Sequence, residues 1–161
     1  MKIINIYPKN KEKFIQLIDF CRKILNICKK LKIKPLAYGS LAIFAYTKNK
    51  EISVNDIDFL ISEANFKKII SELIKKKIKY KYSIKWHVLQ ILKDSLKIEM
   101  DSIEFWQKDL SNNFNDFNIN GLNIKVISLN NLINIYKKLS KISKKNPEEK
   151  HKKYLMLQKI K

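Results

Sequence analysis

Apolar positions in the first half of the chain follow helical and strand patterns. Between Lys11 and Leu31 they recur at spacings of three and four, which predicts an amphipathic helix. Between Asp56 and Ile61 they alternate with other residues, which predicts a strand. The elements predicted up to residue 77 are, in chain order, a helix at 11–31, a strand at 35–38, a short helix at 41–46, a strand at 56–61 and a helix at 64–77.

The second half of the chain starts with period-two alternation and ends with helical spacing. Asn120-Gly121 lies between two apolar runs and predicts a tight hairpin. Ser128 can cap a following helix, and Pro147 suits the first turn of another. The predicted elements are strands at 79–83, 85–92, 96–103, 117–120 and 122–127, a helix at 129–139, and a helix from 147 to the C-terminus.

This order of elements predicts an α+β fold. The strands are too irregularly spaced for a doubly wound sheet, so we expect a small mixed β-sheet with helices packed against it and further helices closing the chain. We expect residues 1–127 to form the core domain. Residues 128–161 would then form a C-terminal helical extension packed on the same domain.

Composition indicates a protein with a packed core outside the membrane. The 161 residues are 45% apolar, yet no apolar run approaches the ~18 residues of a membrane span. The first residues lack the uninterrupted apolar stretch of a secretory signal. Cys21 and Cys28 lie two turns apart on one predicted helix, too far for a disulfide with each other. We therefore expect a cytoplasmic protein; its oligomeric state is left open.

The formal charge of +19 has two interpretations. A strongly basic surface attracts polyanions such as RNA. However, Arg22 is the only arginine, and the abundance of lysine together with asparagine and isoleucine is typical of an AT-rich genome. Arginine is the residue preferred for bidentate phosphate contacts. Charge alone therefore leaves both an RNA partner and a solvated lysine-rich surface open.

Gly39-Ser40 lies where a predicted strand turns into a predicted helix. A helix N-terminus exposes unpaired N–H groups and the positive end of the helix dipole, so it suits a phosphate. A glycine there lets the phosphate approach the backbone, and the serine hydroxyl adds a donor. The alternative is an ordinary turn glycine followed by a capping serine.

Asp56 and Asp58 are two residues apart on a predicted strand, so their side chains project from the same face. Two adjacent carboxylates repel at neutral pH unless a cation lies between them, and Mg²⁺ binds such pairs while keeping positions for substrate phosphates. The alternative is a solvent-facing strand edge. The apolar residues that follow, Phe59 to Ile61, favour a buried strand and therefore a site.

Glu99 and Asp101 share one face of a later predicted strand. If this strand lies beside the first, a third carboxylate joins the pair, and three acids can hold two metal ions, about 3.5–4 Å apart. One acid can also act as general base. We prefer Asp101 as this third acid, with Glu99 as the alternative. Both could instead be exposed charges on a half-solvated hairpin.

The chain resembles the DNA polymerase β-type nucleotidyltransferase superfamily. The resemblance rests on three motifs in this order: Gly-Ser at a helix start, Asp-x-Asp among apolar residues, and a later acidic strand. The resemblance covers about residues 33–103. The small antibiotic nucleotidyltransferases of the lincosamide type and the abortive-infection toxin nucleotidyltransferases are the most similar branches. They share a hydrophobic-Ser helix start, here Val126-Ile127-Ser128, and a closing helix with a Lys/His and Asp pattern. Lys150-His151 matches its first part, whereas Lys152-Lys153 stands where the Asp is expected just after His.

The resemblance implies transfer of a nucleoside monophosphate from an NTP, with ATP expected, to a hydroxyl of a small molecule or RNA, releasing pyrophosphate. It also implies two Mg²⁺ ions. The residues it assigns to nucleotide binding are Gly39, Ser40 and Lys150, and those it assigns to catalysis and metal binding are Asp56, Asp58 and Asp101, with Glu99 as the alternative. The alternative function is a catalytically inactive nucleotide- or RNA-binding domain of the same fold.

Trp86 and His87 fall within the predicted strand at 85–92. In one interpretation, a base or an acceptor stacks on Trp86 and His87 contacts phosphate. In the other, which we prefer, Trp86 packs in the core and His87 is exposed, because adjacent strand residues face opposite sides.

Overall fold

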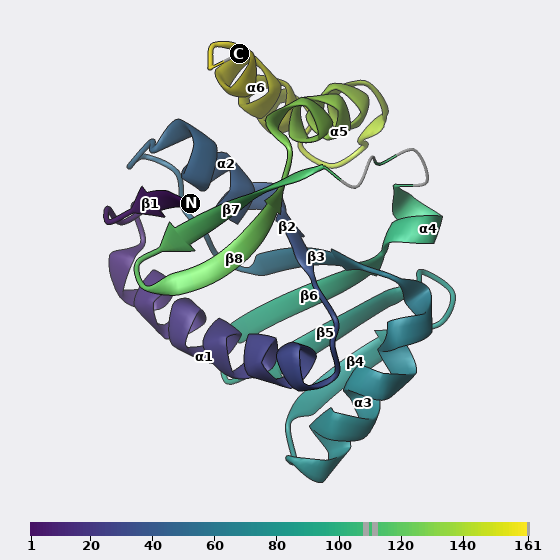
Figure 1. The fold of residues 1–161 in the computed structure, drawn as a ribbon. Helices are drawn as coiled ribbons and strands as arrows, with labels where there is room; N and C mark the ends of the chain where they lie inside the picture. Colours follow the sequence, from purple (N-terminus) through teal and green to yellow (C-terminus); the bar gives the residue numbers. More distant parts are fainter. Residues whose placement is uncertain (108–109, 111–112, 161) are drawn as a thin grey trace.

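A computed structural model describes residues 1–107, 110 and 113–160 of the chain (Figure 1). The helices are α1 Lys11–Lys30, α2 Gly39–Thr47, a 3₁₀ turn η1 at Glu63–Asn65, α3 Phe66–Lys75, α4 Ile103–Trp106, α5 Leu129–Ile142 and α6 Pro147–Gln158. The strands are β1 Lys2–Ile4, β2 Leu36–Tyr38, β3 Ile57–Ile61, β4 Lys79–Ser83, β5 Val88–Lys93, β6 Leu96–Ser102, β7 Phe114–Ile119 and β8 Leu122–Ile127.

The strands form one mixed sheet in the order β1-β7-β8-β2-β3-β6-β5-β4 (Figure 1). Three neighbouring pairs, β1–β7, β2–β8 and β3–β6, are parallel, and the others are antiparallel. The predicted α+β class with a mixed sheet is therefore confirmed. The order also places β2, β3 and β6, which carry or lead into the three candidate motifs, next to one another near the middle of the sheet.

One side of β3 and β6 packs into the core. Ile57 and Phe59 of β3 and Ile98 and Met100 of β6 are fully buried. Since successive strand residues face opposite sides, the residues between them project from the other face. Burial of these apolar residues therefore fixes the direction of the acidic ones, because a register slip of one residue would expose the apolar set.

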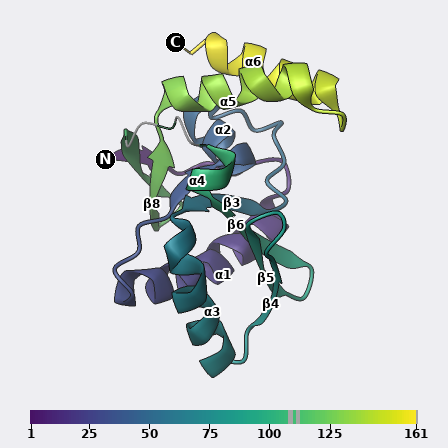
Figure 2. The same ribbon diagram turned by 90° about the vertical axis from the view of Figure 1, so that its right-hand side faces the viewer.

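α2 is a helix surrounded by other elements. Each residue from Leu41 to Ala45 has at most 1% of its surface exposed. α2 contacts β2 and β3 on one side and α5 and α6 on another, and both views show α5 and α6 side by side at one end of the molecule (Figures 1 and 2). Leu157 of α6 is fully buried and belongs to the main core. The predicted domain boundary at 127/128 stays a prediction.

The structure corrects several element boundaries. α2 begins at Gly39 itself, and β7 begins at Phe114. The predicted strand at 85–92 begins only at Val88, because the four residues before it form a turn in which His87 has a positive φ of 53°. Trp86 lies in that turn and is 52% exposed, so the preferred interpretation of a core tryptophan was wrong.

Two further sequence-based expectations concern side chains and membranes. Cys21 and Cys28 are buried free thiols, as expected. Across the described part of the chain, every helix falls short of the length and apolar character needed to cross a bilayer.

Candidate active site

The turn from β2 into α2 brings the backbone against an acidic side chain. Gly39 has a φ of +72°, a conformation that residues with a Cβ rarely adopt. A Cβ at this position would lie 2.4 Å from Asp58 Oδ2. Glycine is therefore needed here both for the backbone conformation and for the close approach of β3.

α2 begins at this turn, beside Asp58. Tyr38, the residue before the helix, is extended and makes no side-chain capping bond, and the first turn of α2 carries no acidic residue. Ser40 is half-buried in that first turn. The first turn of a helix carries unpaired N–H groups and the positive end of the dipole, so this end of α2 favours an anion.

Three carboxylates from two strands converge beside the turn. β3 and β6 pair in parallel with Asp58 opposite Glu99. Asp56 directly precedes β3, and carboxylate oxygens of Asp56, Asp58 and Glu99 lie within 4.8 Å of one another. Hard oxygen ligands at this spacing suit a divalent cation such as Mg²⁺.

The loop that leads to Asp56 is fixed by a side chain from the start of α1. Asn10 Nδ2 donates to the Val54 carbonyl oxygen at 2.7 Å, and Asn10 Oδ1 accepts from the Val54 N–H at 2.9 Å. These two bonds resemble a pair of β-sheet hydrogen bonds, and they fix the backbone two residues before Asp56. Sequence patterns gave no signal for it, because Asn10 and Val54 are far apart in the chain.

Lys97 places a cation among the acids. Its Nζ lies 3.3 Å from Asp56 Oδ2 and 3.4 Å from Glu99 Oε2. Burial lowers the pKa of Lys97, but the carboxylates of Glu99 and Asp56 more than offset this and raise it overall. The ammonium therefore stays charged and neutralises part of the cluster.

Asp101 lies beside the cluster with a different partner. It is opposite Leu60 in the register, and it accepts a hydrogen bond from the Tyr38 hydroxyl. Burial raises the pKa of Asp101 to about 7; the Tyr38 bond works against this, and the Glu99 charge adds to it. The structure thus brings Glu99 together with Asp56 and Asp58, and holds Asp101 against Tyr38.

The surroundings of Asp58 strongly disfavour its ionised form. Burial raises its pKa well above the usual range, and the charges of Asp56, Glu99 and Asp101 raise it further. A carboxyl group in such surroundings is ionised only when a cation compensates it. A site of this kind is more typical of metal or substrate binding than of a structural ion pair.

The C-terminal helices place a buried tyrosine within electrostatic reach of the acids. The pKa of the Tyr136 hydroxyl on α5 is raised, first by burial and then by the charges of Asp58, Glu149 and Asp56. Lys150 Nζ lies over the Tyr136 ring, 5.8 Å from its centre. Lys150 therefore contacts a tyrosine that is within electrostatic reach of Asp58 and Asp56.

No protein-family model and no curated protein sequence matches this chain. Solved structures do match it by shape. The antibiotic-resistance factor ANT(2'')-Ia superposes with a TM-score of 0.65 at 12% identity, over 89% of this chain and 83% of that one. The lincosamide antibiotic adenylyltransferase LnuA, solved with lincomycin, gives 0.58 at 15% identity, over 97% of this chain and 100% of that one.

A viral structure matches part of a longer chain. The Megavirus polyadenylate synthase superposes with a TM-score of 0.58 at 15% identity, over 88% of this chain and 32% of that one. Together these likenesses show that the chain has the nucleotidyltransferase fold that its Gly-Ser and acidic motifs predicted.

Proposed function

We propose that this protein is a Mg²⁺-dependent nucleotidyltransferase, which transfers a nucleoside monophosphate from an NTP to a hydroxyl acceptor and releases pyrophosphate. The observation that carries the proposal is the convergence of Asp56, Asp58 and Glu99 within 4.8 Å, with Asp58 against the Gly39 turn. The nucleotidyltransferase fold supports it. ATP is the NTP we expect, as in the adenylyltransferase LnuA.

Asp56, Asp58 and Glu99 would hold the metal ions, whose positive charge would stabilise the negative charge that develops on the transferred phosphoryl group and on pyrophosphate. Lys97 forms ion pairs with two of these carboxylates, those of Asp56 and Glu99. Since one ammonium cannot neutralise the whole cluster, Lys97 leaves negative charge for a divalent cation. Asp101, the third acid predicted from sequence, stays a candidate for metal binding and for general base.

Other residues of the chain would bind the phosphates of the NTP and accept the proton of the acceptor. The first-turn N–H groups of α2 and the Ser40 hydroxyl would bind the β- and γ-phosphates, and Lys150 would neutralise them. In the transfer step, the acceptor oxygen forms a bond to the α-phosphorus, and the bond from that phosphorus to the bridging oxygen of pyrophosphate breaks. The acceptor proton would pass to a carboxylate, for which Asp101, held by Tyr38, is the candidate.

The test is pyrophosphate release by the purified chain with each NTP and Mg²⁺, in the presence of total RNA, tRNA and a panel of aminoglycosides and lincosamides. Asp56→Asn and Asp58→Asn should each lower turnover by at least about a hundredfold, because each removes a charged metal ligand. Asp94→Asn is the matched control, since Asp94 is exposed in the β5–β6 turn. Equal turnover by all three variants and the wild type would contradict the proposal.

One observation favours the alternative of an inactive binding domain. Lys97 contacts Asp56 and Glu99, so the chain carries its own cation at two of the three acids. Nucleotide binding that is independent of Mg²⁺, without pyrophosphate release for any acceptor, would support this alternative.

A further inference from the structure

Both tryptophans of the chain lie exposed at one place on the surface. Trp86 in the β4–β5 turn is 52% exposed, and Trp106 at the end of α4 is 44% exposed. Their rings are nearly parallel, with centres 6.4 Å apart, and the 42%-exposed ring of Phe105 lies 5.0 Å from that of Trp106. We call Trp86, Phe105 and Trp106 the aromatic platform. Exposed rings that lie side by side are a candidate binding surface.

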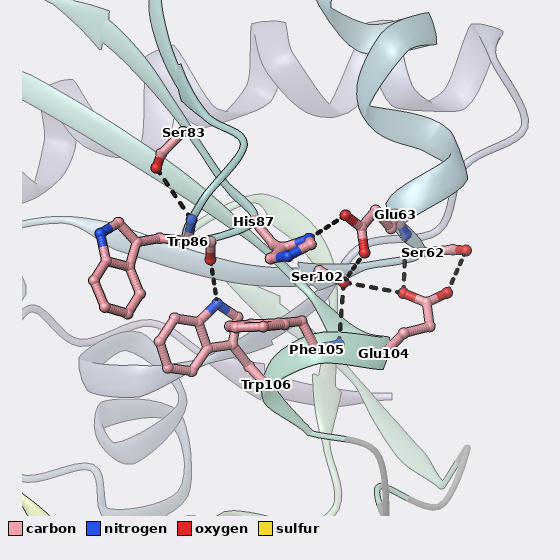
Figure 3. Close-up of polar contacts among 9 residues, drawn as sticks. All are labelled: Ser62, Glu63, Ser83, Trp86, His87, Ser102, Glu104, Phe105 and Trp106. Atoms are coloured by element: carbon pink, nitrogen blue, oxygen red, sulfur yellow. Dashed lines mark hydrogen bonds and ion pairs between the residues drawn. The ribbon is translucent and has the colours of Figure 1, made fainter.

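Polar contacts fix the platform (Figure 3). Trp106 Nε1 donates to the Trp86 carbonyl oxygen at 2.8 Å, which ties α4 to the turn. The His87 ring stacks on Phe105 at 4.1 Å and bonds to Glu63 through Nδ1. The rings are thus held in place before any ligand arrives, which lowers the entropy cost of stacking on them.

A second set of bonds anchors α4 to the end of β3 (Figure 3). Ser102, fully buried at the end of β6, donates to Glu63 Oε2 at 3.0 Å and caps α4 by accepting from the Phe105 N–H. Glu104 accepts from the Ser62 hydroxyl at 2.6 Å and from the Glu63 N–H at 2.9 Å. The carboxylates beside the platform are therefore bound to protein donors.

The platform lies on one side of the acids and the phosphate turn on the other. Across the sheet the order is β2, β3, β6, β5. Gly39 follows β2, Asp58 and Glu99 lie on β3 and β6, and the Trp86 turn precedes β5, whose Val88 pairs with Asp101 of β6. In an in-line displacement the attacking and leaving oxygens lie on opposite sides of the phosphorus. If the Gly39 turn binds the leaving pyrophosphate, the acceptor would approach from the side on which the platform lies.

The surroundings of the platform favour an anionic ligand with planar rings. Lys85 Nζ lies over the Trp86 ring at 5.1 Å. Gln107, the residue after Trp106, lines a cavity of about 320 Å³. The other described residues that line this cavity include Asn134, Lys137 and Lys138, and none of the described lining residues carries a carboxylate. Stacking rings next to lysines and amides are the features that bind single-stranded nucleic acid.

We propose that the aromatic platform binds the 3′-terminal bases of single-stranded RNA, and that this RNA end is the acceptor of the proposed nucleotidyl transfer. The proposal rests on the proposed function for the reaction, but binding of the strand is measurable without turnover. The tryptophans stack on one or two bases, and the lysines contact the phosphates between them.

Intrinsic fluorescence tests the binding directly, because both tryptophans of the chain lie in the platform. Titration of the full chain with a single-stranded 12-mer RNA should quench the emission, and a blunt duplex of the same sequence should quench it far less. Affinity should fall as salt rises, since lysines displace condensed counterions from the strand. Equal quenching by duplex and single strand would overturn the proposal, and so would quenching by lincosamides or aminoglycosides without quenching by RNA.

Substitutions measured by anisotropy of a labelled 12-mer provide the second test. Trp86→Ala and Trp106→Ala should each weaken binding by about 5- to 150-fold, the range for the loss of one base stack. Trp106→Phe should retain much of the affinity, because it keeps a ring. Ile84→Ala is the matched control, since Ile84 is 76% exposed in the same turn and has no ring. Wild-type affinity in both alanine variants would overturn the proposal.

The strand-binding proposal and the proposed function can be contradicted independently of each other. Binding of Mg²⁺–ATP is measured on the same samples, and the platform variants should retain it. If the wild type binds Mg²⁺–ATP but not the 12-mer, the platform proposal is wrong and the proposed function stands. If it binds the 12-mer but releases no pyrophosphate with any NTP, the proposed function is wrong and the strand-binding site stands.

Discussion

At the scale of single residues, Gly39 joins the phosphate turn to the acidic cluster. The structure makes two separate demands on this residue: a backbone with a positive φ, and no Cβ where Asp58 approaches. The sequence predicts the first demand, because glycine at a strand–helix turn is a familiar signal. The second depends on β2 and β3 pairing, with Tyr38 opposite Asp58, and could be seen only in the fold.

We therefore predict that Gly39→Ala abolishes turnover and destabilises the protein by more than the roughly 1–3 kcal/mol of a strained backbone conformation. Gly121→Ala is the matched control: Gly121 also has a positive φ, of 86°, but a Cβ there meets Arg22 only at 3.7 Å. Urea denaturation and pyrophosphate release measure the two effects. Equal destabilisation by the two substitutions would show that the contact with Asp58 is unimportant.

Asp101 gives a prediction about pH. Its pKa of about 7 in the folded protein lies above the roughly 3.9 of an unfolded aspartate, so between these pH values the folded state holds a proton that the unfolded state has lost. The stability this proton confers is complete below about pH 4 and is lost as the pH rises to about 7.

Asp101→Asn does not titrate at this position. In chelator, the melting temperature of the wild type relative to Asp101→Asn should therefore fall between pH 5 and pH 8, as measured by differential scanning fluorimetry at constant ionic strength. A difference that stays constant over this range would mean that Asp101 is already ionised in the folded protein.

At the scale of elements, α6 depends on one buried side chain. Leu157 is fully buried in the main core, whereas Leu155, two residues earlier, is 45% exposed. The helix was predicted from Asn146-Pro147, since proline suits a first helical turn, and it does begin at Pro147. Its burial against the rest of the molecule has no such local signal, because α6 is polar over most of its length.

We predict that Leu157→Ala destabilises the protein by roughly 2–4 kcal/mol and that Leu155→Ala has little effect. A single cooperative unfolding transition in both variants would support the predicted packing of residues 128–161 on the core domain. A separate early transition in Leu157→Ala would instead show that the C-terminal helices unfold independently.

The β4–β5 connection shows where element prediction failed. Residues 85–87 alternate suitably for a strand, but His87 adopts a positive φ and bonds to Glu63. α4, the four-residue helix that carries Trp106, was also unpredicted, because four residues are too few to show helical periodicity. The aromatic platform therefore could not be read from either segment alone.

At the scale of the whole molecule, charge balance governs the acidic cluster. The chain carries a formal charge of +19, yet Asp56, Asp58 and Glu99 gather at one place, where Lys97 bridges two of them. A divalent cation that binds the folded state alone stabilises it, by about 2.7 kcal/mol at a hundred times its dissociation constant.

We predict that Mg²⁺ raises the melting temperature of the wild type, and that Asp56→Asn and Asp58→Asn abolish the shift. Lys97→Met should lower the melting temperature in chelator and enlarge the shift, because the metal-free acids lose their counter-cation. Calorimetric titration with Mn²⁺ measures the same site without turnover. A Lys97→Met shift no larger than that of the wild type would mean that the lysine does not compete with the metal.

The sequence by itself determined the local features of this protein: the apolar periodicities, the Gly39-Ser40 turn, the paired aspartates and the fold class, since these depend on residues close together in the chain. Tertiary structure decided that Glu99 lies within 4.8 Å of the two aspartates while Asp101 bonds to Tyr38, where Lys97 lies, and that both tryptophans share one exposed surface. Strand register and the meeting of distant turns decide these contacts, because burial of the apolar face fixes them and no local pattern encodes them.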